Sequence, residues 1–163
     1  MAKNILIVDD DRGILKSFKD ILDPEGYSVD TAENALEAVE KCKARPYNLA
    51  IIDIKLRDVD GTDLLAQVHE ILPRARKIMI TGYPSLENAV DSVNLQADAY
   101  IIKPVNPETF LKVVAENMDK QLEAERMAED KVVGWVESRY EETRRNRSKR
   151  KPMGPELLPN AEE

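Results

Sequence analysis

Apolar and polar positions along the 163-residue chain follow two alternating patterns. Runs of four mostly branched apolar residues are too short for helices and predict buried β-strands. Between these runs, apolar residues recur every three or four positions, which predicts amphipathic helices. The strand-like runs are Ile5–Val8, Val29–Ala32, Leu49–Ile52, Lys77–Ile80 and Ala99–Ile102.

The regular alternation predicts an α/β domain of about 120 residues, in which a parallel sheet carries helices on both faces in a right-handed (βα)5 arrangement. Residues with short polar side chains stand where helices should begin, and we expect Asp11, Asn34 and Ser85 to be N-caps. Prolines that cannot continue a helix follow three of the helical segments, at Pro24, Pro46 and Pro73.

The pattern after Pro107 stays helical to about Arg147. This divides the chain into a domain at 1–120, a helical extension at 121–148 and a tail at 149–163 that we expect to be disordered, because it contains three prolines.

Charge and composition exclude several classes of protein. The chain has 24 Lys and Arg against 31 Asp and Glu, a net charge of -7. A single cysteine, Cys42, excludes an internal disulfide framework, and a single histidine, His69, excludes His-based zinc clusters. We expect Cys42 to be a small core residue and His69 an exposed helix residue. No apolar run approaches the roughly 18 residues of a transmembrane helix, so we expect a cytoplasmic protein without membrane insertion.

Polar side chains follow four of the predicted strands. Asp9 and Asp10 come after the first strand, Asp53 after the third, Thr81 after the fourth and Lys103 after the fifth. Ligands of parallel α/β sheets gather outside the carboxyl ends of the strands, so we expect these groups to form one site.

Three carboxylates in one pocket require a cation. Two like charges about 4 Å apart repel by about 4 kcal/mol at an effective dielectric near 20. Carboxylate oxygens without histidine or thiolate ligands favour Mg²⁺, with Mn²⁺ as an alternative. Lys103 offers a point charge suited to phosphate, and Thr81 offers a hydroxyl donor.

Four motifs at these positions resemble the receiver domain of two-component response regulators, including the chemotaxis type. They are ILIVDDD at 5–11, DIKLRDVDG at 53–61, which is similar to the family's D-x-x-[ML]-P-x-x-[DN]-G, ITG at 80–82 and YIIKP at 100–104. The resemblance covers residues 3 to about 120 and implies a flavodoxin-like sheet with strand order 2-1-3-4-5. Arg57 stands where the family usually has proline.

The resemblance implies a signalling domain rather than an enzyme, with only intrinsic phosphorylation and dephosphorylation. Asp53 would accept a phosphoryl group from a sensor histidine kinase. Asp10, Asp53, Asp9 and the backbone carbonyl of Lys55 would hold Mg²⁺. Lys55 and Tyr83, which flank the site, would tune the lifetime of the phosphate, and we expect Tyr83 to shield it from water.

The resemblance also implies how phosphorylation is read out. Lys103 and Thr81 would bind the phosphoryl oxygens, and Thr81 and Tyr100 would form the switch pair. The peptide bond between Lys103 and Pro104 would be cis, as is usual in the family.

The output is open on sequence grounds. No DNA-binding domain is recognisable, which favours signalling by protein contact, with a homodimer through the fourth helix, fifth strand, fifth helix and extension as one form. The basic run Arg144–Lys151 is by default a solvated surface, and it is too short to form a winged helix or helix-turn-helix for nucleic acid. Phosphorylation-gated binding of nucleic acid or a partner through this extension is the alternative.

Gly134 costs roughly 1 kcal/mol relative to alanine in a helix and favours a kink or break there. A partner-binding or self-pairing helix would use Val132, Trp135, Val136 and Tyr140.

Two enzyme-like or cofactor-binding readings are weaker. The string DVDGT at Asp58–Thr62 is similar to the nucleophile motif of haloacid-dehalogenase-type phosphatases, but it does not directly follow a predicted strand. A flavodoxin-type FMN site is disfavoured because Asp9, Asp10 and Asp11 would repel the FMN phosphate.

Overall fold

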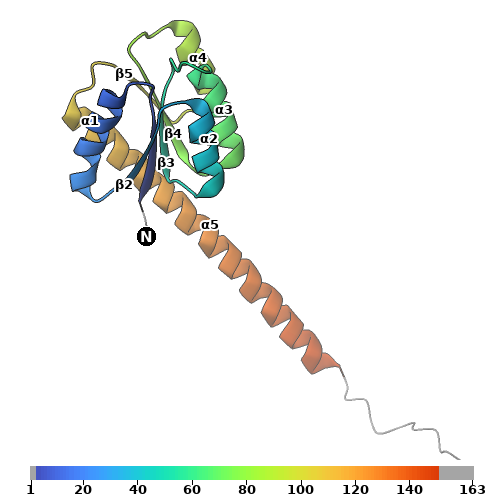
Figure 1. Ribbon diagram of the computed structural model, residues 1–163. Coiled ribbons are helices and arrows are strands. Elements are labelled where there is room, and N and C mark those ends of the chain that lie inside the picture. Colours follow the sequence, from blue (N-terminus) through green and yellow to red (C-terminus); the bar gives the residue numbers. More distant parts are fainter. Residues whose placement is uncertain (1–2, 151–163) are drawn as a thin grey trace, which may run out of the picture. The chain divides into compact units, whose positions relative to one another are not determined.

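The computed structural model describes residues 3–150, and its centre is a five-stranded parallel sheet (Figure 1). The strand order is β2-β1-β3-β4-β5, which confirms the predicted α/β class and the implied 2-1-3-4-5 order. The strands are β1 (Asn4–Val8), β2 (Ser28–Ala32), β3 (Leu49–Asp53), β4 (Arg76–Thr81) and β5 (Ala99–Ile102).

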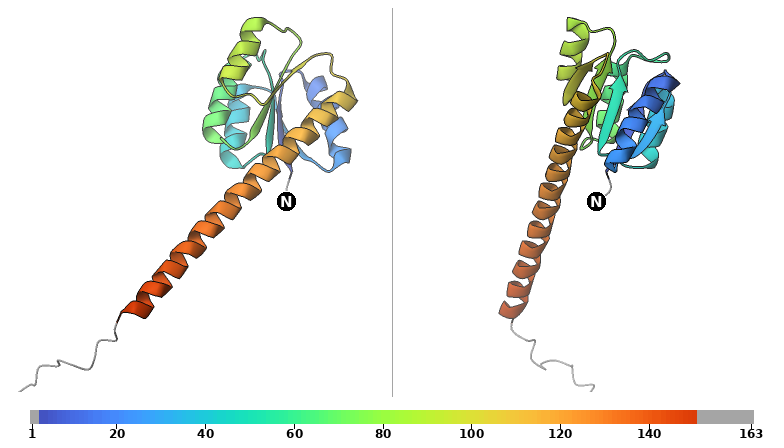
Figure 2. Two further views of the ribbon diagram at one scale, coloured as in Figure 1. Left: turned by 180° about the vertical axis from the view of Figure 1, so that it is seen from behind. Right: turned by 90° about the vertical axis from the view of Figure 1, so that its left-hand side faces the viewer.

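Helices cover both faces of the sheet. The first part of α5 packs with α1 on one face, while α2 and α3 cover the other, with α4 beside α3 (Figures 1 and 2). The helices are α1 (Arg12–Leu22), the short 3-10 helix η1 (Asp23–Glu25), α2 (Ala35–Ala44), α3 (Gly61–Ile71), α4 (Leu86–Asn94) and α5 (Pro107–Lys149).

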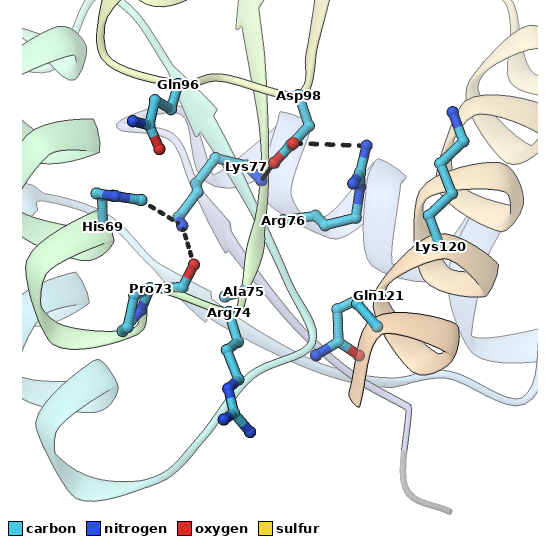
Figure 3. Close-up of a pocket in the computed structure, with 11 residues that line it drawn as sticks. His69, Pro73, Arg74, Ala75, Arg76, Lys77, Gln96, Asp98, Lys120 and Gln121 are labelled. Carbon is cyan, nitrogen blue, oxygen red and sulfur yellow. Dashed lines mark hydrogen bonds and ion pairs between the residues drawn. The ribbon is translucent and has the colours of Figure 1, made fainter. Parts of the chain in front are cut away.

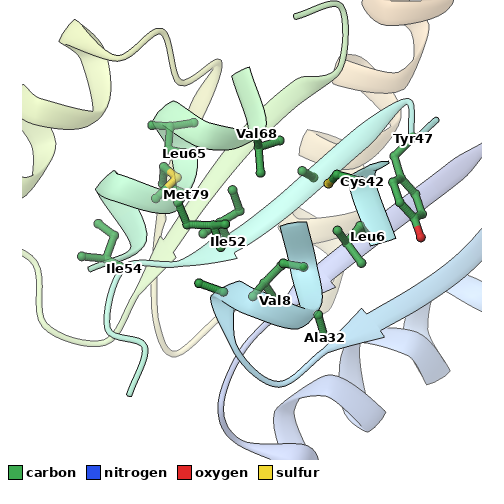
Figure 4. Packing of buried hydrophobic residues seen from close by; sticks show 14 residues of the cluster. Leu6, Val8, Ala32, Cys42, Tyr47, Ile52, Ile54, Leu65, Val68 and Met79 are labelled. Atoms are coloured by element: carbon green, nitrogen blue, oxygen red, sulfur yellow. The ribbon is translucent and has the colours of Figure 1, made fainter. Parts of the chain in front are cut away.

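The apolar runs of the central strands serve two cores at once, because successive side chains of a strand point to opposite faces. In β1, Leu6 and Val8 join the core beneath α2 and α3 (Figure 4), whereas Ile5 and Ile7 join the core beneath α1 and α5. This two-sided burial explains why the strands read as continuous apolar runs rather than alternating ones.

The predicted helix caps are confirmed. The Asn34 side chain accepts a hydrogen bond from the Glu37 N–H (2.8 Å), and the Ser85 hydroxyl accepts one from the Asn88 N–H (3.1 Å). Asp11 accepts from the first turn of α1. Each cap satisfies an N–H that has no partner within its helix, so the first turns begin where the sequence places them.

The structure corrects two expectations about single residues. α5 is helical without interruption through Gly134, so the expected kink or break is absent from this described helix. His69 is half-buried and hydrogen-bonded to Lys77 rather than exposed, whereas Cys42 is a buried core residue as predicted. No helix within residues 3–150 is both long enough and apolar enough to cross a membrane.

The chain forms two units, and the first is compact and extends to Glu125, slightly beyond the predicted boundary at 120. In the second unit, which begins at Arg126, the described residues are helical to Lys149. Most of the expected disordered tail, residues 151–163, lies outside the described residues. Apolar side chains of the second unit that are more than half exposed are Met127, Val132, Val133, Trp135, Val136 and Tyr140.

Gly61, at the start of α3, lies directly against the backbone at the end of β3. Its N–H donates to the carbonyl of Ile54 (2.7 Å). A Cβ at this position would lie 2.6 Å from the Cα of Ile54 and closer still to the carbonyl oxygen of Asp53. Both obstacles are backbone atoms, so a larger side chain would force the start of α3 away from the sheet.

We therefore expect Gly61→Ala to lower the free energy of unfolding by about 1–3 kcal/mol or more, because overpacking against backbone is poorly relieved. Gly134→Ala is the matched control, since a Cβ there meets nothing within 4 Å, and it should stabilise its helix by about 1 kcal/mol. Urea denaturation followed by circular dichroism measures both. An unchanged midpoint for Gly61→Ala would contradict this account of the α3 junction.

Candidate functional site

Polar side chains from four strand ends meet at the carboxyl edge of the sheet. Asp9 follows β1, Asp53 ends β3, Thr81 ends β4 and Lys103 follows β5. Because β1, β3, β4 and β5 are consecutive neighbours in a parallel sheet, their ends lie side by side. One carboxylate oxygen from each of Asp9, Asp10 and Asp53 lies within 4.8 Å of the others. The grouping predicted from sequence is therefore present.

The Lys103 ammonium bridges two of these carboxylates. Its Nζ lies 2.9 Å from Asp9 Oδ2 and 3.0 Å from Asp53 Oδ2. Burial by itself would lower the pKa of Lys103, but the hydrogen bonds to Asp9 and Asp53 outweigh it, and the pKa is raised. Lys103 is therefore held as a cation between the two acids.

Burial acts on the acids in the opposite sense. Asp9 is almost fully buried, and this desolvation raises its pKa, with repulsion from Asp53 adding to the effect. Hydrogen bonds from Lys103 and from the Asp11 N–H to Asp9 oppose the rise. Asp53 is 7% exposed, and its Oδ1 accepts a hydrogen bond from the Lys55 N–H (3.1 Å).

The charge balance of the cluster fits a divalent cation. Three carboxylates and one ammonium leave two negative charges in excess. Arg57 lies 3.5 Å from Asp10, but its side chain is 84% exposed, and such surface pairs contribute little. Carboxylate oxygens grouped in this way are the ligands that Mg²⁺ prefers, so the residues present fit the metal.

Of the expected switch pair, Thr81 lies at the site, whereas Tyr100 lies on β5 opposite Met79, two residues before Thr81. Thr81 is fully buried, and its Oγ1 accepts a hydrogen bond from the Tyr83 N–H (3.0 Å). The Tyr100 ring packs against the core beneath α2 and α3. Its hydroxyl is buried and has no hydrogen-bond partner among the described residues. The Lys103–Pro104 peptide bond is cis.

Lys55 and Tyr83, which lie two residues after Asp53 and Thr81, contact each other. The Lys55 ammonium lies 4.2 Å from the centre of the Tyr83 ring, in a cation-π arrangement. The ring is 69% exposed. The pair thus connects the segment after β3 with the segment after β4.

Sequence reasoning missed the roles of three polar residues near the site. Asp58 accepts hydrogen bonds from the N–H groups of Ala35 and Leu36 at the start of α2 (3.0–3.2 Å). Asp60 caps α3 through the Thr62 N–H. Arg57 pairs with Asp10. The role of Asp58 depends on the tertiary contact between the β3–α3 loop and α2. The Asp60 cap is local, and the aspartate just before a helical segment could have indicated it.

Comparison with known proteins agrees with this geometry. The family model described as the response regulator receiver domain matches residues 5–115. The chain belongs to this family. The family assignment agrees with the order of the four motifs along the chain.

Individual relatives are similar over the same region. A CheY-like receiver domain protein from Methanospirillum hungatei JF-1 is 51% identical, with a TM-score of 0.74 and coverage of 76% of this chain and 99% of that one. A response regulator from Burkholderia pseudomallei, described with a phosphorylated aspartic acid, a calcium ion and citrate, is 32% identical, with a TM-score of 0.67 and coverage of 76% and 72%. The alginate biosynthesis transcriptional regulatory protein AlgB of Pseudomonas putida is 34% identical over 121 residues, 74% of this chain. The receiver chain spans only 27% of AlgB.

The unpartnered hydroxyl of Tyr100 gives a direct test of the site's packing. Because a buried polar group without a partner costs about 1–3 kcal/mol, we expect Tyr100→Phe to unfold at equal or higher urea concentration than the parent protein. Circular dichroism in urea measures this, and Tyr47→Phe is the control, since the Tyr47 hydroxyl is hydrogen-bonded to Asp30 (2.6 Å) and its loss should destabilise. A Tyr100→Phe protein less stable than the parent would contradict an unsatisfied hydroxyl.

Proposed function

We propose that this receiver domain accepts a phosphoryl group on Asp53 from the phosphohistidine of a sensor histidine kinase. The observation that carries the proposal is the Lys103 ammonium, which lies within 3.0 Å of both Asp9 and Asp53 at the edge where three carboxylates meet. The phosphorylated aspartic acid described for the Burkholderia pseudomallei relative supports the same chemistry.

In the proposed step, an Asp53 carboxylate oxygen attacks the phosphorus atom. A P–O bond forms as the P–N bond of phosphohistidine breaks, and the imidazole leaves. Phosphoryl transfer depends mainly on positioning and charge neutralisation. The Lys55 N–H orients Asp53 through Oδ1, and Lys103, already 3.0 Å from Oδ2, pairs with a phosphoryl oxygen.

The metal site of the proposal uses Asp9, Asp10, Asp53 and the backbone carbonyl of Lys55. Mg²⁺ bound there, or Mn²⁺, would neutralise charge on the transferring group. Asp9 has its own bond to Lys103 and the Asp11 N–H, so it would act mostly through the waters of the metal.

Phosphorylation would then shift a conformational equilibrium. Thr81 would turn its hydroxyl, now an acceptor for the Tyr83 N–H, toward the phosphoryl oxygens as a donor. The Tyr100 ring would then turn inward behind the Thr81 hydroxyl. Moving such an equilibrium from 1:99 to 99:1 takes about 5.5 kcal/mol, which two or three charge-assisted hydrogen bonds can supply.

The proposed output is contact with another protein, including a second copy of this chain. Exposed apolar side chains on α4 and β5 favour it, because water-exposed groups of this kind gain free energy when covered. They are Leu86, Val90, Val93 and Ile102. The second candidate is phosphorylation-gated nucleic-acid binding. It is favoured by the name of AlgB and by the exposed basic residues within 144–150, whose neighbour Lys151 lies outside the described residues.

Phosphorylation can be tested by incubating the protein with acetyl phosphate and Mg²⁺ and measuring the intact mass. We expect the mass of one added phosphoryl group, which Asp53→Asn abolishes because it removes the nucleophile and which chelation of Mg²⁺ strongly reduces.

Asp58→Asn is the control for this experiment, because Asp58 is an exposed acid five residues after Asp53 that bonds the start of α2 rather than Lys103. It should still take up one phosphoryl group. Phosphorylation that survives Asp53→Asn and is lost in Asp58→Asn would instead favour the phosphatase-like motif.

The lifetime of the phosphate tests the role of Tyr83. If its ring, held against Lys55, shields the acyl phosphate from water, Tyr83→Ala should lose phosphate about two- to fivefold faster, since an exposed cation-π contact is worth about 0.5–1 kcal/mol. Tyr83→Phe keeps the ring and should resemble the parent protein. Release of phosphate from the purified phosphoprotein measures the rates, and an unchanged rate in Tyr83→Ala would refute the shielding role.

A further inference from the structure

A second charged cavity lies at the other end of β4. It has a volume of about 380 Å³ and is formed by the end of α3, the start of β4, the segment between α4 and β5, and α5 (Figure 3). None of the phosphoryl-site residues lines it. β4 therefore connects two polar sites, with Thr81 at one end and Arg76 at the other.

A buried lysine forms part of the wall of this cavity. Lys77 is 2% exposed, and its Nζ lies 3.0 Å from His69 Nδ1 and 3.3 Å from the Pro73 carbonyl oxygen (Figure 3). Neither of these partners is an anion. An ammonium group has three donors, so one remains for another acceptor. Burial lowers the pKa of Lys77, which reflects the cost of keeping this charge out of water.

The cavity is basic although the protein is acidic. Arg74, Arg76, Lys77 and Lys120 line it with cations, against the single carboxylate of Asp98, while the whole chain has a net charge of -7. Asp98 is already engaged, since it pairs with Arg76 (3.4 Å) and accepts a hydrogen bond from the backbone N–H of Lys77 (2.8 Å).

Three of these cations have no carboxylate partner within residues 3–150. They are Lys77 in the wall, Arg74 three residues earlier in the chain and Lys120 on α5. The following β4 residues 78–80 are apolar and fully buried. In the same strand, an apolar side chain at position 77 would pack without the desolvation cost of a buried charge. The lysine is therefore not explained by packing alone.

We propose that this cavity binds a small molecule with two or more phosphate or carboxylate groups. A cavity of this volume lies at the lower end of the range for small-molecule sites, about 300–1,000 Å³. Lys77 supplies a desolvated point charge, which suits phosphate and carboxylate oxygens. Lys120 supplies a second cation from a different element, so a ligand with two anionic groups satisfies both. The inference does not depend on phosphoryl transfer to Asp53.

His69 provides a selective readout, because it is the single histidine of the chain and contacts Lys77 directly. We expect pyrophosphate, and citrate as the carboxylate counterpart, to shift the imidazole NMR signals of the full-length protein saturably. Sodium chloride at matched ionic strength should leave the His69 signals unshifted. Anions that meet only Lys103 at the phosphoryl site would leave the signals of His69 in place.

Three variants decide between a built site and general charge screening. Lys77→Met should weaken pyrophosphate binding at least about tenfold, because a charge-assisted hydrogen bond is lost. Lys120→Ala should weaken it about two- to fivefold, as expected for one partly exposed ion pair. Lys112→Ala, on the same helix but outside the cavity, should bind as the parent protein does.

If Lys77→Met does not fold, the comparison of Lys120→Ala with Lys112→Ala still tests the proposal, because both side chains are exposed on α5. Unmoved His69 signals with both probes would overturn it. Equal weakening by Lys120→Ala and Lys112→Ala, or signals that move equally with sodium chloride, would also overturn it, because these outcomes indicate screening rather than a site. If citrate alone or pyrophosphate alone binds, the ligand belongs to that one class of anion.

Discussion

Repulsion among carboxylates at one edge of a parallel sheet is the constraint on which the site depends. Asp9, Asp10 and Asp53 would destabilise each other if no cation lay between them. Lys103 supplies part of the compensation from the neighbouring strand end. The compensation is incomplete, and the residual negative charge favours a divalent cation at this edge. The same charges that repel one another thus favour a cation, and in the proposed function that cation would in turn offset the charge of the phosphoryl group.

The sequence predicted the strands and the grouping of the site because both follow from local rules. β1 and β3 are buried on both faces, so their apolar runs are unmistakable, and parallel pairing brings their carboxyl ends together. Caps such as Asn34 and Ser85 were predictable for a similar reason, since a cap and its helix are adjacent in the chain.

What the sequence did not reveal depends on contacts between distant segments or on sums of small terms. The hydrogen bond of His69 to Lys77 and the pairing of Arg57 with Asp10 require the tertiary arrangement. Gly134 carries a cost of about 1 kcal/mol, which is small beside the summed propensity of the Ala-, Glu- and Arg-rich turns farther along the helix in both directions, and α5 continues through it. The unpartnered Tyr100 hydroxyl could not be predicted either, because nothing in the sequence shows which acceptors a half-buried ring will reach.

The tight junction at Gly61 also couples the start of α3 to the end of β3. Because Gly61 lies against the backbone of Asp53 and Ile54 and donates a hydrogen bond to the Ile54 carbonyl, the first turn of α3 is held closely to the end of β3. The loop between β3 and α3, residues 55–60, is itself held at two points, since the Lys55 N–H bonds to Asp53 and Asp58 bonds to the start of α2. If Asp53 accepts a phosphoryl group as proposed, a displacement at the end of β3 would therefore reach α3 through the Gly61 contact and α2 through the hydrogen bonds of Asp58.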